Sequence, residues 1–163
     1  TDRLWTIRRG EQPHPVMPEP TRVTHEWWDP DGKHVLCVKQ PHYIWRVRLA
    51  DSYVEKITVP DSRMCLHAHA SADGRLLVGD DTDVHEGWYR GGRTKVYFLN
   101  RDTGTKLTLA DNPAQDNYSG RNYHIDPHPR FCCNDRYVVF TTTVRNEVDI
   151  AITPVEELVN KTQ

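Results

Sequence analysis

The stretch THEWWDPDGKHVLCV, residues Thr24–Val38, carries the pattern from which the fold can be predicted. In it, His25 is followed by five residues, then by the pair Asp31-Gly32, and then by an apolar run. An Asx-Gly pair between two strand-like runs favours a tight two-residue hairpin. The stretch is therefore expected to form two antiparallel strands, with the histidine at the start of the first.

Two later stretches repeat this pattern, namely LHAHASADGRLLVGD, residues Leu66–Asp80, and PHPRFCCNDRYVVFT, residues Pro127–Thr141. Each has a histidine, five residues, a turn pair and an apolar run, and the first two copies of the pattern are followed by a second pair of strand-like runs. The histidines of these two copies, His25 and His67, are 42 residues apart. Units of four antiparallel strands that recur about every 40 residues are typical of β-propeller blades.

The fold expected from these repeats is an all-β propeller, of which the chain supplies about three four-stranded blades. We expect residues 1–22 to end one blade, 23–60 and 61–110 to form two blades, and 111–163 to form the last blade and a C-terminal turn. A closed propeller typically has about four to eight blades. The remaining blades are therefore expected from the same chain or from another chain, because an open sheet edge attracts further strands.

The C-terminal run TPVEELVNK, residues 153–161, has the features of a short helix. Thr153 is the expected cap, Pro154 the expected first helical residue, and Glu156 completes the spacing of a capping box. A helix of one or two turns is expected here.

Composition and charge exclude several classes of function. The 163 residues carry a net charge of −2, with 21 basic and 23 acidic residues interspersed, so nucleic acid is not an expected partner. No apolar run approaches the roughly 20 residues that a membrane-spanning helix needs. Cys37 and Cys65 lie in apolar strand patterns and Cys132-Cys133 are neighbours, which favours reduced thiols in a cytoplasmic protein over a disulfide framework. The strand-like run that follows Thr1 suggests that the start of the protein lies upstream.

The three repeat histidines are the first candidates for function. The first strand of each propeller blade lines the central channel, and His25, His67 and His128 each lie six residues before the turn pair. The repeat therefore places their imidazoles at the same height around one axis, where they are expected to converge. The alternative is that each is a hydrogen-bonded structural residue.

A metal site is expected around the third histidine. Asp126 and His128 flank Pro127, and residues two apart in an extended strand point the same way. Imidazole nitrogen and carboxylate oxygen together suit a divalent transition metal. His124 has the same parity, so the predicted metal ligands are His67, Asp126, His128 and His124. His69 lies deeper along its strand and ranks below them.

Aromatic residues suggest where a substrate binds. Trp27, Trp28 and Trp45 fall in strand patterns and are expected in the core. Trp88 and Arg90 lie instead in a Gly-rich loop that interrupts the repeat, where an aromatic and a cation suit contact with an acidic sugar. The alternative is that they anchor the loop. Trp88 and Arg90, with His25 lining the channel, are the predicted substrate-binding residues.

Taken together, the repeats resemble the C-terminal part of the oligogalacturonate lyases, which are seven-bladed β-propeller enzymes of pectin breakdown. The resemblance is carried, in order, by LWTIRR (4–9), THEWWDPDG (24–32), SADGRLLVGDD (71–81), VYFLN (96–100), DPHPRF (126–131) and YVVFTT (137–142). Generic propeller repeats share the turns but not the leading histidines.

The resemblance implies a manganese-like divalent ion, held by a histidine equivalent to His67 and by a Gln-x-x-His-Pro-His motif in the next blade. This chain has His128 at the last histidine of that motif, Asp126 at the first, and Tyr123 at the glutamine. Aspartate is a competent oxygen ligand, and His124 is positioned to replace the missing nitrogen. Mn²⁺ is thus the expected cofactor, with a changed ligand set.

The reaction implied is metal-dependent β-elimination in 4-linked galacturonate oligosaccharides. The resemblance implies that the catalytic base is an arginine in a segment that is expected before Thr1. No catalytic residue is therefore assigned within this chain. Two alternatives stay open. One is a non-catalytic propeller that serves as a binding or interaction module. The other is a related lyase that acts on a different uronate or has lost activity, which the changes at Tyr123 and Asp126 would fit.

Overall fold

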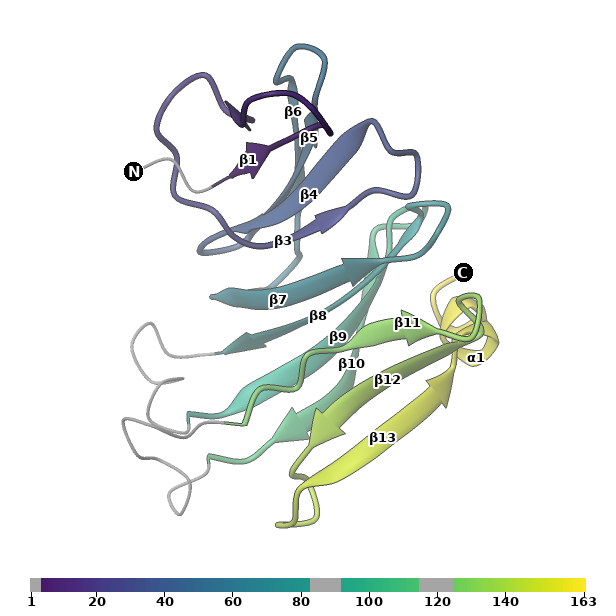
Figure 1. Ribbon diagram of the computed structural model, residues 1–163. Helices are drawn as coiled ribbons and strands as arrows, with labels where there is room; N and C mark the ends of the chain where they lie inside the picture. Colours follow the sequence, from purple (N-terminus) through teal and green to yellow (C-terminus); the bar gives the residue numbers. More distant parts are fainter. Residues whose placement is uncertain (1–3, 83–91, 115–124) are drawn as a thin grey trace.

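The protein, described here by a computed structural model for residues 4–82, 92–114 and 125–163, consists almost wholly of β-strands (Figure 1). The strands are β1 (Trp5–Thr6), β2 (His14–Pro15), β3 (Thr24–Trp28), β4 (His34–Lys39), β5 (Tyr43–Arg48), β6 (Val54–Thr58), β7 (Cys65–Ala70), β8 (Leu76–Thr82), β9 (Thr94–Asn100), β10 (Thr105–Asn112), β11 (Arg130–Cys132), β12 (Tyr137–Thr142) and β13 (Asp149–Pro154). They form two four-stranded sheets, β3–β6 and β7–β10, one three-stranded sheet, β11–β13, and the small β1–β2 pair. Within each sheet the strands are antiparallel and follow chain order.

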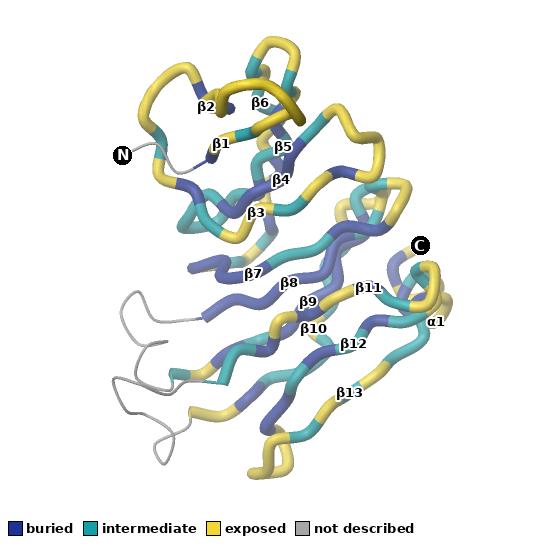
Figure 2. The backbone as a smooth tube through the Cα atoms, in the orientation of Figure 1, coloured by how far each residue is buried: buried dark blue, intermediate teal, exposed yellow. Residues whose placement is uncertain are grey.

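The sheets lie one after another along the chain (Figure 1), and apolar side chains fill the spaces between them. Strand β8 shows how: Leu77 packs in a core cluster with Leu36 of β4, whereas its neighbour Val78 packs in another cluster with Phe131 of β11. Successive side chains of a strand point to opposite faces. The second sheet is therefore buried on both faces, which places β7 and β8 in the middle of the described structure (Figure 2).

The hairpin loops are longer than the predicted two-residue turns, so that prediction was wrong. The Asp29 N–H donates to the His34 carbonyl at 3.0 Å, and residues 30–33 form the loop between them. Gly32 adopts a φ of +63°, and the equivalent Gly74 a φ of +71°. The reason lies in the aspartates: Asp31 accepts the N–H of Lys33, two residues on, which extends the turn.

The C-terminal helix α1 (Val155–Lys161) begins one residue later than expected. Thr153 is not its cap, because Thr153 pairs with Val138 in the sheet, and Pro154 occupies the cap position without a side-chain hydrogen bond. Val155 and Leu158 bury one side of the helix. Within the described part of the chain, no helix is long and apolar enough to cross a bilayer.

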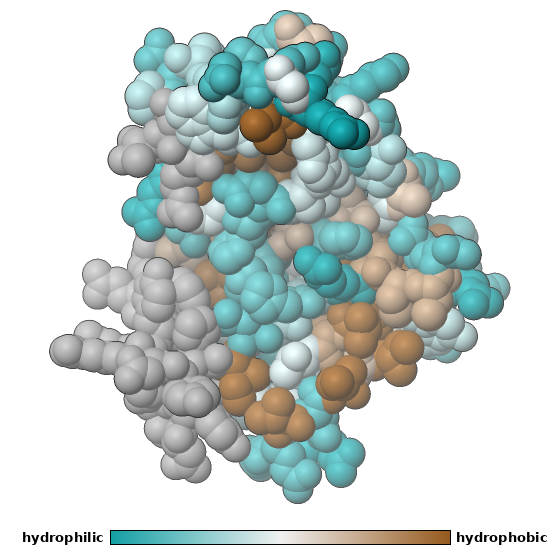
Figure 3. All heavy atoms as spheres, in the orientation of Figure 1, coloured by the Kyte–Doolittle hydropathy of each residue, from teal (hydrophilic) through white to brown (hydrophobic). Residues whose placement is uncertain are grey.

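Both ends of the stack expose apolar side chains. Trp28 is 59% exposed, contrary to the expected core position, whereas Trp27 and Trp45 are partly buried against core clusters. At the other end, Ile150 and Ile152 of β13 are 80% and 61% exposed. Figure 3 shows apolar atoms gathered on the face that carries β13. These outer faces have the composition of surfaces that pack against something further.

Candidate metal centre

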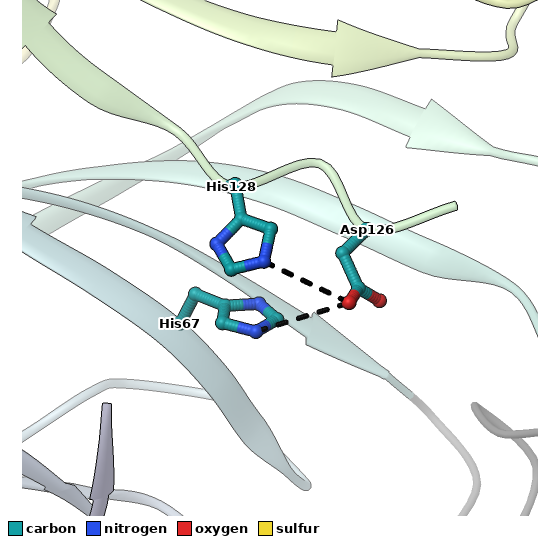
Figure 4. A group of neighbouring side chains, drawn as sticks. All are labelled: His67, Asp126 and His128. Carbon is teal, nitrogen blue, oxygen red and sulfur yellow. Dashed lines mark ion pairs between the residues drawn. The ribbon is translucent and has the colours of Figure 1, made fainter. Parts of the chain in front are cut away.

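Three of the predicted ligands lie together. The ligand atoms of His67, Asp126 and His128 all lie within 4.8 Å of one another (Figure 4). The Asp126 carboxylate is 4.0 Å from Nε2 of His67 and 3.7 Å from Nε2 of His128. Since two imidazole nitrogens and a carboxylate oxygen form a donor set that divalent transition metals favour, these residues fit such an ion. Their role as ligands stays a prediction.

The cluster is buried on one side and open on the other. His67 is 5% exposed, whereas the side chain of His128 is 56% exposed. The imidazole rings of these two residues are 3.6 Å apart between centroids. An ion or a substrate would therefore reach the cluster from the side of His128.

His67 owes its position to an irregularity in β7. The ladder between β7 and β8 shifts register between Cys65 and Ala68, so His67 lies outside the regular pairing. Its backbone N–H donates instead to the side chain of Asp80, at 2.7 Å. Because of the bulge, the backbone of His67 is held by the Asp80 carboxylate and not by a backbone partner on β8.

Asp80 was missed by the sequence analysis. Its carboxylate is fully buried and accepts from Nδ1 of His67, at 3.0 and 3.1 Å to its two oxygens, and from the backbone N–H of His128 at 3.1 Å. One side chain on β8 therefore contacts two of the predicted histidine ligands, His67 and His128. A signal was present in the sequence, because Asp80-Asp81 ends the apolar run LLVG, and a buried acid needs partners.

Asp80 also shapes the electrostatics of the pair. Burial acts to lower the pKa of His67, but the hydrogen bond and negative charge of Asp80 outweigh it, so the pKa of His67 is raised. The pKa of His128 is lowered, first by the partial burial of its ring and then by the charge of His67.

Asp126 and His128 converge by a different route from the one predicted. Residues 125–129 precede β11 and are not an extended strand, and His128 has a φ of +44°. Such left-handed values are uncommon for residues other than glycine. Pro127 is fixed at β12 because its carbonyl accepts the N–H of Thr141 at 2.9 Å. This anchored bend brings the two side chains to His67.

The other predicted site residues have different outcomes. His25 is exposed and its ring centroid lies 4.1 Å from that of His67, which places it beside the cluster but outside the set of three. His69 lies two residues further along β7, where its Nδ1 accepts the N–H of Phe131 at 3.4 Å. His124, Trp88 and Arg90 lie outside the described residues.

A second group with possible metal ligands, Asp29, Asp31 and His34, lies at the first hairpin loop. Arg46 occupies it: its guanidinium donates to Asp29 at 2.5 Å and to Asp31 at 2.8 Å. A cation is thus already present among these carboxylates, so the group is an ion-pair network.

No protein-family model matches the chain. Among curated proteins, it is 28% identical over 162 residues to an oligogalacturonide lyase of Pectobacterium atrosepticum, a match covering 87% of this chain and 40% of the relative. It is 26% identical over 131 residues to an oligogalacturonate lyase of Dickeya dadantii, covering 74% of this chain and 34% of that protein. The chain thus spans well under half the length of these relatives.

Solved structures confirm the propeller-type fold. An oligogalacturonate lyase in complex with manganese matches 94% of this chain and 42% of its own, with a TM-score of 0.66 and 24% identity. An oligogalacturonate lyase from Vibrio parahaemolyticus gives the same coverage and identity and a TM-score of 0.67. TolB from Acinetobacter baumannii, at 18% identity, matches 89% of this chain and 33% of its own with a TM-score of 0.58.

Proposed function

Since the chain is related to the oligogalacturonate lyase family through most of its length, we propose that it supplies the metal-binding part of a lyase. The substrates are 4-linked galacturonate oligosaccharides, cleaved by β-elimination. The observation that carries the proposal is the cluster of His67, Asp126 and His128. By the resemblance, His67 and His128 stand where the family has histidine ligands.

The chemistry explains why such a lyase needs a cation. The proton to be removed lies beside the uronate carboxylate and is very weakly acidic while that carboxylate keeps its negative charge. A divalent ion, Mn²⁺ in this proposal, acts when bound as a Lewis acid that neutralises this charge and favours the enolate-like product of deprotonation.

The chain's own residues hold that ion and face the sugar. His67 and Asp126 would hold it from the buried side, and the exposed His128 would complete the set next to solvent. His25, exposed beside His67, contacts the sugar at the channel rim. No base that removes the proton is assigned among the residues of this chain, so the roles that we propose for it are ion binding and substrate contact.

We also infer that further blades cover the ends of the stack. The exposed Ile150 and Ile152 on β13, and Trp28 at the other end, are the side chains on which those blades pack. Activity is therefore to be measured on the intact protein.

The test begins with metal binding. Titration calorimetry with Mn²⁺ should show one site, and His67→Ala should weaken it by more than about 100-fold, beyond the usual effect of changing a residue that only supports a ligand. His14→Ala is the matched control, because it makes the same change at an exposed histidine of β2, outside the cluster, and should leave affinity intact.

The second step measures the reaction. The intact protein should convert digalacturonate to an unsaturated product that absorbs in the ultraviolet, and a chelator should abolish the signal. Protein that binds no Mn²⁺ and gives no chelator-sensitive product would instead be a non-catalytic binding module.

A further inference from the structure

Asp80 occupies a place where a charge is costly. It lies in the middle of the described sheets on β8, its carboxylate is fully buried, and neighbouring residues Leu77 and Val78 belong to apolar clusters. A buried charge is tolerated only where hydrogen bonds satisfy it. The donors to Asp80 come from His67 and His128: two backbone N–H groups and one imidazole nitrogen.

The local structure of β7 and β8 is built to let these contacts form. The bulge at His67 frees its N–H from the ladder, and the residue before Asp80 is Gly79. A Cβ on Gly79 would lie 2.6 Å from the carbonyl oxygen of His67 and would collide with the ring of Tyr97. The absence of a side chain at Gly79 thus allows β8 to approach the backbone of His67 closely.

The contacts fix the protonation of the His67 ring. An ionised carboxylate only accepts hydrogen bonds, so the nitrogen that faces it must carry the proton. Nδ1 of His67 faces both oxygens of Asp80, at 3.0 and 3.1 Å. In the neutral ring the other nitrogen, Nε2, is then unprotonated, and it is this atom that faces Asp126.

We propose that Asp80 is a positioning residue that sets the tautomer of His67 and holds the backbone of His128, so that two sheets present one preassembled pair of histidines. It acts through these residues and does not bind the ion. Its consequence for Mn²⁺ rests on the proposed function, but the tautomer and the backbone contact are properties of the metal-free protein.

The decisive variant is Asp80→Asn, which keeps the shape of the side chain. Each oxygen of Asp80 accepts a backbone N–H, one from His67 and one from His128. In Asp80→Asn, an NH₂ group replaces one of these oxygens and faces a backbone N–H, so that two donors oppose each other. Where the NH₂ group faces Nδ1 of His67, it favours the opposite tautomer, with the proton on Nε2. Asp81→Asn is the matched control, since Asp81 is the next residue and also buried, but it pairs with Lys106.

The first measurement needs no metal. Long-range ¹H–¹⁵N NMR of the metal-free intact protein, at a pH where the histidines are neutral, reports the tautomer of His67, and a His67→Gln spectrum assigns its signal. Wild type and Asp81→Asn should show the proton on Nδ1, and Asp80→Asn should lose that preference. A wild-type spectrum with the proton on Nε2 overturns the proposal, even if the variants do not fold.

The second measurement is Mn²⁺ affinity of the same proteins. Asp80→Asn should bind about 10- to 100-fold more weakly, the usual effect of removing a partner that orients a ligand, and Asp81→Asn should bind like wild type. Equal losses in both variants would mean that Asp80 has only a structural role. If wild type binds no Mn²⁺ but shows the Nδ1 tautomer, the proposed function fails while the positioning role stands.

Discussion

The first two repeats begin alike and end differently. His25 and His67 each precede an Asp-Gly turn by six residues, and the two repeats are 42 residues apart. At the equivalent position of the strand after the turn, the first repeat has Val38 and the second has Asp80. Both residues are fully buried. Val38 joins the apolar core between the sheets, whereas Asp80 binds the histidine of its own repeat.

This difference explains the fates of the two histidines. His25 is exposed with a φ of +54°, whereas His67 is buried and turned toward Asp126. A repeat histidine at the start of a strand is therefore not sufficient to make a ligand site. In the second repeat, the carboxylate on the second strand holds the imidazole by a hydrogen bond.

The largest expected effect comes from transplanting the acid into the first repeat. Val38→Asp buries a carboxylate in an apolar cluster and should lower the free energy of unfolding by about 3–5 kcal/mol, the usual cost of an unpaired buried charge. Urea unfolding measures it, and Val38→Thr, of equal shape but uncharged, is the control. An equal loss in both variants would mean that His25 supplies partners as His67 does.

A second contrast lies one residue on, where Lys39 of the first repeat corresponds to Asp81 of the second. Lys106 donates to Asp81 at 2.9 Å, and both side chains are largely buried. Lys106→Met leaves Asp81 without this cation and should cost about 3 kcal/mol of unfolding free energy at neutral pH.

The pH dependence of this loss follows from Asp81. Burial raises the pKa of Asp81, and the charge of Lys106 only partly opposes it. A group whose pKa is higher in the folded state contributes stability below its unfolded pKa, about 3.9 for aspartate, and loses it as the pH rises through the folded value. The cost of Lys106→Met should therefore shrink as the pH is lowered toward 4, and in an Asp81→Asn background it should not depend on pH in this range.

Gly79 and Cys37 are a third equivalent pair, and here the first repeat carries a buried side chain where the second carries none. Gly79→Ala should destabilise the protein by about 1–3 kcal/mol because the new methyl group overpacks against Tyr97 and the backbone of His67. Calorimetric unfolding measures this loss. Tyr97→Phe removes the hydroxyl nearest to the new methyl group. In a Tyr97→Phe background, Gly79→Ala should therefore cost less stability than it does in the wild-type background. An equal cost in both backgrounds would place the clash at the remaining ring atoms of residue 97 or at the His67 backbone.

The smallest effect is expected at His25 itself. His25→Asn keeps a residue that tolerates a positive φ, and because His25 is exposed the stability should change by less than about 0.5 kcal/mol. Mn²⁺ affinity, measured by calorimetry, should stay at the wild-type value. A marked loss of affinity would add His25 to the ligands and remove the contrast between the two repeats.

Local patterns were enough to predict the propeller, because each repeat carries its leading histidine, its turn pair and its apolar run within a short stretch. The same patterns did not give the length of the hairpin loops, since this depends on how Asp31 bonds to the backbone of Lys33. They also misplaced Trp28, whose burial depends on what packs beyond the first sheet.

The candidate site was predictable in its members but not in its construction. The spacing of His67, Asp126 and His128 brought them under consideration, yet the bend at His128 and the bulge at His67 are departures from regular strands. Asp80 contacts His128 across 48 residues of sequence and between two sheets. Such a contact depends on how sheets stack, which no local pattern specifies.

Because Asp80 and His67 belong to one sheet and His128 leads into the next, the cluster lies on the seam between two neighbouring units of the stack. Any treatment that separates these units by a fraction of an ångström, whether heat, chaotrope or a smaller residue between them, will disturb the cluster while every strand keeps its ladder. Release of a bound ion should then precede the loss of the far-ultraviolet circular dichroism signal, so that ion affinity becomes a sensitive measure of the spacing between neighbouring blades.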